Sequence, residues 1–142
     1  MNPDTILYPG IAMFALTLSA IAALGIARYR AIQRREVSIK YFRTYDEGTQ
    51  PAYLHRLARH VQNHFEVPPL FYFGLLFSFV TGSVGALSVA FAWLFVAARC
   101  VHSWIHLGSN DVSRRFFTFA LSLVFLAGLW ATLLVSLLRS SG

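Results

Sequence analysis

The sequence predicts an all-α integral membrane protein, a four-helix bundle in which each chain crosses the bilayer four times. The first observation is composition: 56% of the 142 residues are hydrophobic, only 13% are charged, and the mean hydropathy is +0.56. A soluble domain has about a quarter of its residues charged. The second observation is a pair of uncharged runs of 23 residues, Thr5–Ala27 and Phe116–Leu138, each long enough to span a bilayer. The length leaves room for one domain, residues 1–142.

The four transmembrane spans are expected at residues 5–28, 52–81, 84–107 and 115–138, with recognisable connections between them. Residues 28–50 form a basic connector, whose end from Asp46 to Pro51 has the composition of a loop. Gly82-Ser83 forms a short turn, and Asn110 and Asp111 are expected cap or turn residues before the last span. Two consecutive prolines, Pro68-Pro69, remove two helix donors within the second span and predict a kink there.

The Lys/Arg distribution predicts the orientation. Eight basic residues lie in the first connector and the start of the second span, and Arg114 and Arg115 lie between the third and fourth spans. The opposite side carries only Arg139. By the positive-inside rule, both basic connections face the cytoplasm and both termini face away from it. The net charge of +6 is therefore interpreted as a topology signal, and no nucleic-acid partner is expected.

A polar stripe at the start of the second span is the main candidate for a site. Arg56, Arg59, Asn63 and Glu66 fall within roughly a third of a helix circumference. The second and third spans are joined by a tight turn, so residues at equal depth have sequence numbers that add up to about 165. The polar residues that this rule pairs are Glu66 with Arg99, Asn63 with His102, and Arg59 with His106. Because Arg99, His102 and His106 also share one helix face, two polar stripes are predicted to border one cavity.

Each of these features also has a purely structural interpretation. Glu66 and Arg99 could form a buried ion pair that fixes helix packing, with or without a ligand role. The proline kink could be only a kink, or it could open a cavity beside Glu66.

Two pairs of histidines raise the possibility of a metal site. His60 with His64, and His102 with His106, have an i, i+4 spacing that suits a metal, but the interspersed arginines would repel a cation. His60 and His64 are also expected to point partly away from the stripe, and no metal ligand is assigned.

Other classes of site find little support. The single cysteine, Cys100, excludes an internal disulfide and a cysteine-based zinc cluster. No glycine-rich phosphate-binding loop is present, so a dehydrogenase or nucleotide site is not supported.

The string Arg59-x3-Asn63-x2-Glu66-x2-Pro69, entering a hydrophobic span, resembles the MAPEG family, the membrane-associated proteins in eicosanoid and glutathione metabolism. The segment AARCVHSWIHLGSNDVSRRF resembles the end of that family's third helix, especially in its bacterial branch. The resemblance implies a homotrimer, with glutathione as co-substrate bound between subunits near the cytoplasmic face. It implies that Arg59, Asn63 and Glu66 contact glutathione, and it favours a bacterial inner membrane.

The chain departs from the family pattern on the third span, where relatives carry tyrosines and this chain has His102 and His106. We expect these imidazoles, with Arg99, to contact the ligand as hydrogen-bond donors. An arginine that stabilises the glutathione thiolate is also implied. The candidates are Arg28, Arg30, Arg114 and Arg115, of which Arg28 and Arg114 are assigned this role.

The resulting prediction is a membrane glutathione transferase or peroxidase that acts on a lipophilic electrophile or lipid peroxide. One alternative is a non-catalytic membrane protein that binds a lipid or an anionic ligand. A membrane metal-binding enzyme is the less favoured alternative.

Overall fold

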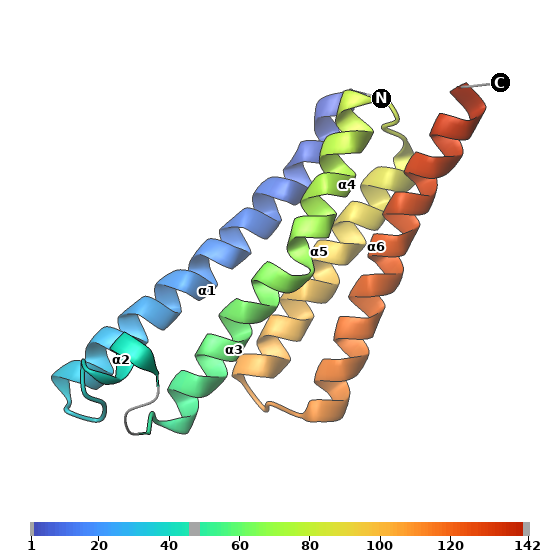
Figure 1. Ribbon diagram of the computed structural model, residues 1–142. Coiled ribbons are helices and arrows are strands. Elements are labelled where there is room, and N and C mark those ends of the chain that lie inside the picture. The colour runs from blue at the N-terminus through green and yellow to red at the C-terminus, as the bar shows by residue number, and fades with distance from the viewer. Residues whose placement is uncertain (1, 46–48, 141–142) are drawn as a thin grey trace.

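The computed structural model describes residues 2–45 and 49–140, and the regular elements in this part of the chain are all helices (Figure 1). They are the 3-10 helix η1 (Pro3–Ile6) and the α-helices α1 (Leu7–Gln33), α2 (Tyr41–Thr44), α3 (Ala52–Glu66), α4 (Pro68–Val80), α5 (Ala86–Leu107) and α6 (Val112–Ser140). Of the loop expected at 46–51, residues 46–48 lie outside the described residues. The all-helical prediction is confirmed for the part of the chain that the structure describes.

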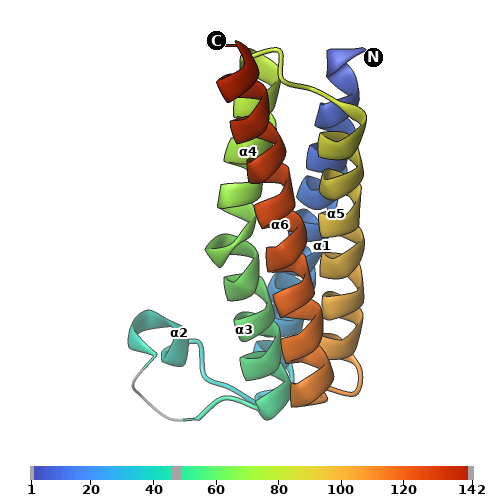
Figure 2. The same ribbon diagram turned by 90° about the vertical axis from the view of Figure 1, so that its right-hand side faces the viewer.

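Three helical segments are long and apolar enough to cross a membrane: Pro3–Gln33, Ala86–Leu107 and Val112–Ser140. They correspond to the first, third and fourth predicted spans. The second predicted span is instead divided into α3 and α4, which follow one another nearly in line with a break at Val67 (Figure 2). The break has the predicted cause, because Pro68 and Pro69 have no N–H to donate to the carbonyls of the preceding turn.

Two helices extend beyond the limits predicted from the sequence, α1 at its C-terminal end and α6 at its N-terminal end. α1 continues through Arg28 and Arg30 to Gln33, because arginine is a good helix former and a membrane boundary does not by itself end a helix. α6 begins at Val112 and not at residue 115, because Asp111 caps it. The Asp111 Oδ1 accepts a hydrogen bond of 2.9 Å from the backbone N–H of Arg114, as an N-cap residue does.

The helices pack into a bundle with α1 against α3 and α5, α5 along α6, and α4 against α6 (Figure 2). Its core includes Phe71 and Phe95, whose rings stack with centroids 4.3 Å apart, and the fully buried Met13 and Leu129. Many large apolar side chains are exposed on the outside, Trp104 at 81% among them. Such an exterior suits lipid, because soluble proteins rarely expose large contiguous apolar patches.

Candidate functional site

A polar cavity of about 240 Å³ opens where the last turns of α5 meet the first turns of α6. It is lined by Arg59, Asn63 and Glu66 from α3, by His102 and His106 from α5, and by Val112, Arg115, Phe116 and Phe119 from α6. The structure therefore brings together five of the six residues that the sequence predicted to bind the ligand. Arg99, the sixth, is not part of the lining.

The contacts between α3 and α5 agree with the predicted depths to within about one helical turn. The rings of His60 and His106 lie with their centroids 5.2 Å apart, one residue from the predicted pairing of Arg59 with His106. Arg99 contacts Asn63, three residues from its predicted partner Glu66. The α4–α5 turn thus sets the register of the two polar stripes, as the sequence suggested.

Arg99 lies inside the bundle and caps the end of α3. Its side chain is fully buried, and its Nη2 donates a hydrogen bond of 2.7 Å to the backbone carbonyl of Asn63. Asn63 belongs to the last four residues of α3, whose carbonyls lack helical donors. A cation at this end also interacts favourably with the helix dipole. Arg99 therefore supports the residue that lines the cavity, and does not itself face the opening.

The predicted ion pair between Glu66 and Arg99 is wrong for the described part of the chain. The ion pairs found there are Arg34–Glu36 and Arg114–Asp111. The physical reason is that equal depth does not fix which way a side chain points. Glu66 is exposed on the cavity side of α3, while Arg99 is buried within the bundle.

Four histidines form a buried cluster next to the cavity, and two of them, His102 and His106, also line it. The other two are His60 and His64, and each of the four is no more than 2% exposed. Neighbouring ring centroids are 4.8 Å apart for His60 and His64, 5.2 Å for His60 and His106, and 5.9 Å for His102 and His106. The expectation that His60 and His64 point away from the stripe is correct, but they point into the bundle and contact the same cluster. The i, i+4 spacing of both pairs was the signal that could have indicated this.

Hydrogen bonds to neighbouring helices orient two of these rings. The Nδ1 of His64 lies 3.0 Å from the Thr17 hydroxyl of α1, and the same hydroxyl donates to the Met13 carbonyl. The Nδ1 of His102 lies 3.1 Å from the Arg115 carbonyl of α6. Because both neighbours act as acceptors, the proton is assigned to Nδ1 in both rings. The Nε2 atoms of both rings are buried without a hydrogen-bond partner among the described residues.

The described residues contain no group of three or more His, Cys, Asp or Glu side chains that could hold a metal ion. The histidine cluster is therefore not arranged as a metal site, and the buried guanidinium of Arg99 contacts the helix that carries His60 and His64. A cation placed among these rings would meet a fixed positive charge close by.

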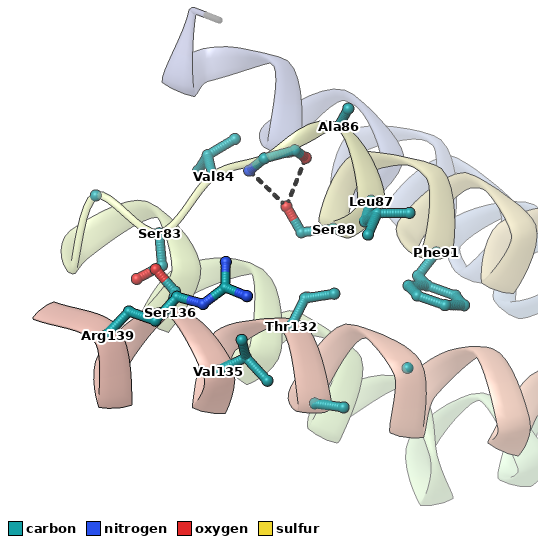
Figure 3. Close-up of a pocket in the computed structure, with 14 residues that line it drawn as sticks. Ser83, Val84, Ala86, Leu87, Ser88, Phe91, Thr132, Val135, Ser136 and Arg139 are labelled. Atoms are coloured by element: carbon teal, nitrogen blue, oxygen red, sulfur yellow. Dashed lines mark hydrogen bonds between the residues drawn. The ribbon is translucent and has the colours of Figure 1, made fainter.

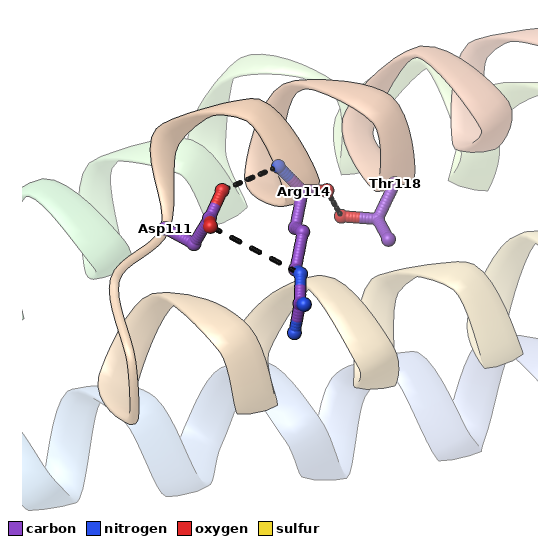
Figure 4. A network of polar contacts seen from close by, with 3 residues as sticks. All are labelled: Asp111, Arg114 and Thr118. Carbon is purple, nitrogen blue, oxygen red and sulfur yellow. Dashed lines mark hydrogen bonds and ion pairs between the residues drawn. The ribbon is translucent and has the colours of Figure 1, made fainter.

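The two arginines assigned to the thiolate do not line the cavity. Arg114 points away from α6, its Nε lies 4.0 Å from Asp111 Oδ2, and its side chain is 73% exposed (Figure 4). Arg28 lies over the ring of Phe42 in α2, with 5.2 Å from its Cζ to the centroid. Arg115 does line the cavity, and its Nη1 donates to Asn110 Oδ1 at 2.7 Å. The first turn of α6 thus presents Arg115 to the site, and Asp111 holds Arg114 outside.

A second polar cavity of about 440 Å³ adjoins the first and shares Arg59, His106 and Arg115 with it. Its other lining residues are Ala52, His55, Arg56, Ser109 and Asn110. Three arginines and one exposed acid therefore border the combined opening. This arrangement suits a ligand that carries more than one anionic group and a cationic one.

A family model matches residues 6–135 of the chain, and its description is the MAPEG family. The matched residues run from the end of η1 into α6 and include every residue that lines the first polar cavity. No curated protein and no solved structure matches the chain.

Proposed function

Since the chain belongs to the MAPEG family, we propose that it is a multi-pass membrane protein that binds glutathione in the two adjoining polar cavities and uses it on lipophilic substrates. The observation that carries the proposal is the common cavity of Arg59, Asn63, Glu66, His102 and His106. With the adjoining cavity, the space reaches the size of ligand pockets, about 300–1,000 Å³.

The charges around the opening complement those of glutathione. The tripeptide carries two carboxylates, which suit the guanidinium groups of Arg56, Arg59 and Arg115, and one ammonium group, which suits Glu66. Glu66 is exposed and has no ion-pair partner among the described residues, so its carboxylate is available to a ligand. The side chain of Asn63 provides both a donor and an acceptor for the peptide backbone of the ligand.

Arg115 replaces Arg28 and Arg114 as the residue that we assign to the thiolate. It lines both cavities, and Asn110 holds its side chain in place. A nearby positive charge favours the thiolate, which is the nucleophile. In a transfer reaction the thiol proton passes to solvent, the sulfur forms a bond to the electrophilic carbon, and any leaving group departs with its electron pair. In peroxide reduction two glutathione thiols are oxidised to a disulfide, while the hydroperoxide is reduced to an alcohol and water.

The proposal includes the topology and assembly that the sequence suggested. α3 and α4 together cross the bilayer as the second of four spans, with the basic connections and the cavity on the cytoplasmic side and both termini opposite. The chain assembles as a homotrimer in a bacterial inner membrane. Mass measurement in mild detergent tests the assembly, and a monomer as the sole species would contradict it.

Thiolate absorbance tests the central claim. Glutathione added to the purified protein should increase ultraviolet absorbance from bound thiolate, and Arg115→Met should abolish this increase. Arg114→Met is the matched control, because it removes the neighbouring arginine that points away from the cavity. Glutathione binding without thiolate absorbance would favour the non-catalytic alternative. Absence of binding by calorimetry would refute the proposal itself.

A further inference from the structure

We propose that a groove at the opposite end of α5 and α6 from the polar cavities binds an anionic phospholipid from the surrounding bilayer. The groove has a volume of about 620 Å³, larger than either polar cavity, and shares no lining residue with them. It lies between the α4–α5 turn, the first turns of α5 and the last turns of α6 (Figure 3). This inference does not depend on glutathione binding.

The walls of the groove are suited to an acyl chain. Leu87, Phe91 and Val135 provide large apolar surfaces, and the small residues Ala131 and Gly128 leave space between them. Two hydroxyl groups in the lining are already satisfied, since Ser88 donates to the Gly85 carbonyl and Thr132 donates to the Leu129 carbonyl. The middle of the groove therefore offers little to a polar ligand but a favourable surface to a hydrocarbon chain.

Arg139 provides a charged group at the mouth of the groove. Its guanidinium lies over the groove between the α4–α5 turn and α6 (Figure 3), and it has no hydrogen-bond or ion-pair partner among the described residues. No Lys or Arg occurs in residues 1–27, 60–98 or 116–138, so Arg139 is the one basic residue expected at this membrane surface. It follows an uncharged run of 23 residues, which places it at the level of the lipid headgroups.

Charge complementarity and location together identify the occupant. A guanidinium binds phosphate oxygens through two parallel hydrogen bonds, and basic residues at a membrane surface attract anionic headgroups. A small soluble anion would leave the apolar walls uncovered. A phospholipid places its phosphate on Arg139 and an acyl chain between Leu87, Phe91 and Val135, which satisfies both parts of the groove.

Lipid binding to the full-length protein in mild detergent tests this inference. Native mass spectrometry would count bound phosphatidylglycerol and phosphatidylcholine with identical acyl chains. Wild type should prefer phosphatidylglycerol by about fivefold, the size of one arginine contact with an anionic lipid. Arg139→Gln should abolish the preference, whereas Arg34→Gln, a change of an exposed arginine in the basic connector, should keep it.

A second variant separates the groove from the headgroup contact. Ala131→Phe fills the groove and should reduce binding of both lipids, with the helical content unchanged by circular dichroism. Equal binding of the two lipids by wild type, or a preference that persists in Arg139→Gln, would overturn the inference. A disulfide cross-link between two chains of the Leu87→Cys/Val135→Cys variant would also overturn it, because a second copy would then occupy the groove.

Discussion

Replacing Thr17 by valine tests whether the link between α1 and the histidine cluster stabilises the fold. The Thr17 Oγ1 lies 3.0 Å from both the Met13 carbonyl and the His64 Nδ1. Valine has nearly the shape of threonine but cannot accept a hydrogen bond, so the change leaves the His64 N–H buried and unpaired. An orphaned buried donor costs about 1–3 kcal/mol, while hydrogen bonds between helices in membranes contribute about 0.6 kcal/mol on average and 1.7 at most. We therefore expect Thr17→Val to lower the free energy of unfolding by about 1–2 kcal/mol.

Two controls are needed. One variant keeps the hydrogen-bond acceptor at position 17, and a double-mutant cycle removes both Thr17 and His64. Thr17→Ser retains the hydroxyl and should lose less than half of the effect. In the double variant Thr17→Val/His64→Leu the His64 N–H is removed together with its acceptor, so its cost should be less than the sum of the two single changes. Unfolding of each variant in mixed micelles, followed by circular dichroism, gives the four free energies. Equal stability of Thr17→Val and wild type, or strictly additive costs, would refute the assigned hydrogen bond.

Three further changes have distinct expected outcomes. Glu66→Gln should change the free energy of unfolding by less than about 0.5 kcal/mol, because Glu66 is exposed and forms no ion pair in the described chain, yet it should reduce the thermal stabilisation by added glutathione. Gly128→Ala should destabilise by about 1–3 kcal/mol, since its Cβ would lie 2.6 Å from the Phe91 ring; Gly25→Ala, with nothing within 4 Å, should show no such cost in the same melting experiment. His106→Phe should weaken glutathione binding by about 3- to 10-fold in calorimetry, because it removes one hydrogen-bonding group from the cavity lining, and an unchanged affinity would exclude a contact.

The sequence was sufficient to predict the depth of a residue along the bundle. It was not sufficient to predict the direction in which the side chain points around the helix axis. Uncharged runs located α1 and α6, and the short turn before α5 fixed which residues of α3 and α5 lie level with one another. The same argument could not tell that Arg99 faces the interior while Glu66 faces the cavity. Rotation about the helix axis depends on packing against all neighbouring helices, and one sequence with one turn does not define it.

The sequence also could not tell which of the two neighbouring arginines, Arg114 or Arg115, faces the cavity. These residues are adjacent, so they point about 100° apart on a helix. Which of them faces the cavity depends on where α6 begins. The predicted start at residue 115 left Arg114 outside the helix and put Arg115 at its first position, whereas the N-cap at Asp111 includes both residues in the helix and directs Arg114 outward. A capping residue was recognised in the sequence, but its consequence for the following arginines required the structure.

The proline break and the buried arginine act as one structural unit. A helix that ends at Glu66 inside a bundle leaves carbonyls without donors, and in a membrane no water is present to satisfy them. Arg99 donates to one of these carbonyls from α5, and its charge lies at the favourable end of the helix dipole. Because the accepting carbonyl belongs to Asn63, the same contact fixes the backbone that presents Asn63 and Glu66 to the cavity. The break thus separates the polar α3 from the apolar α4, which continues nearly in line with it, and Arg99 holds the end of α3 against α5.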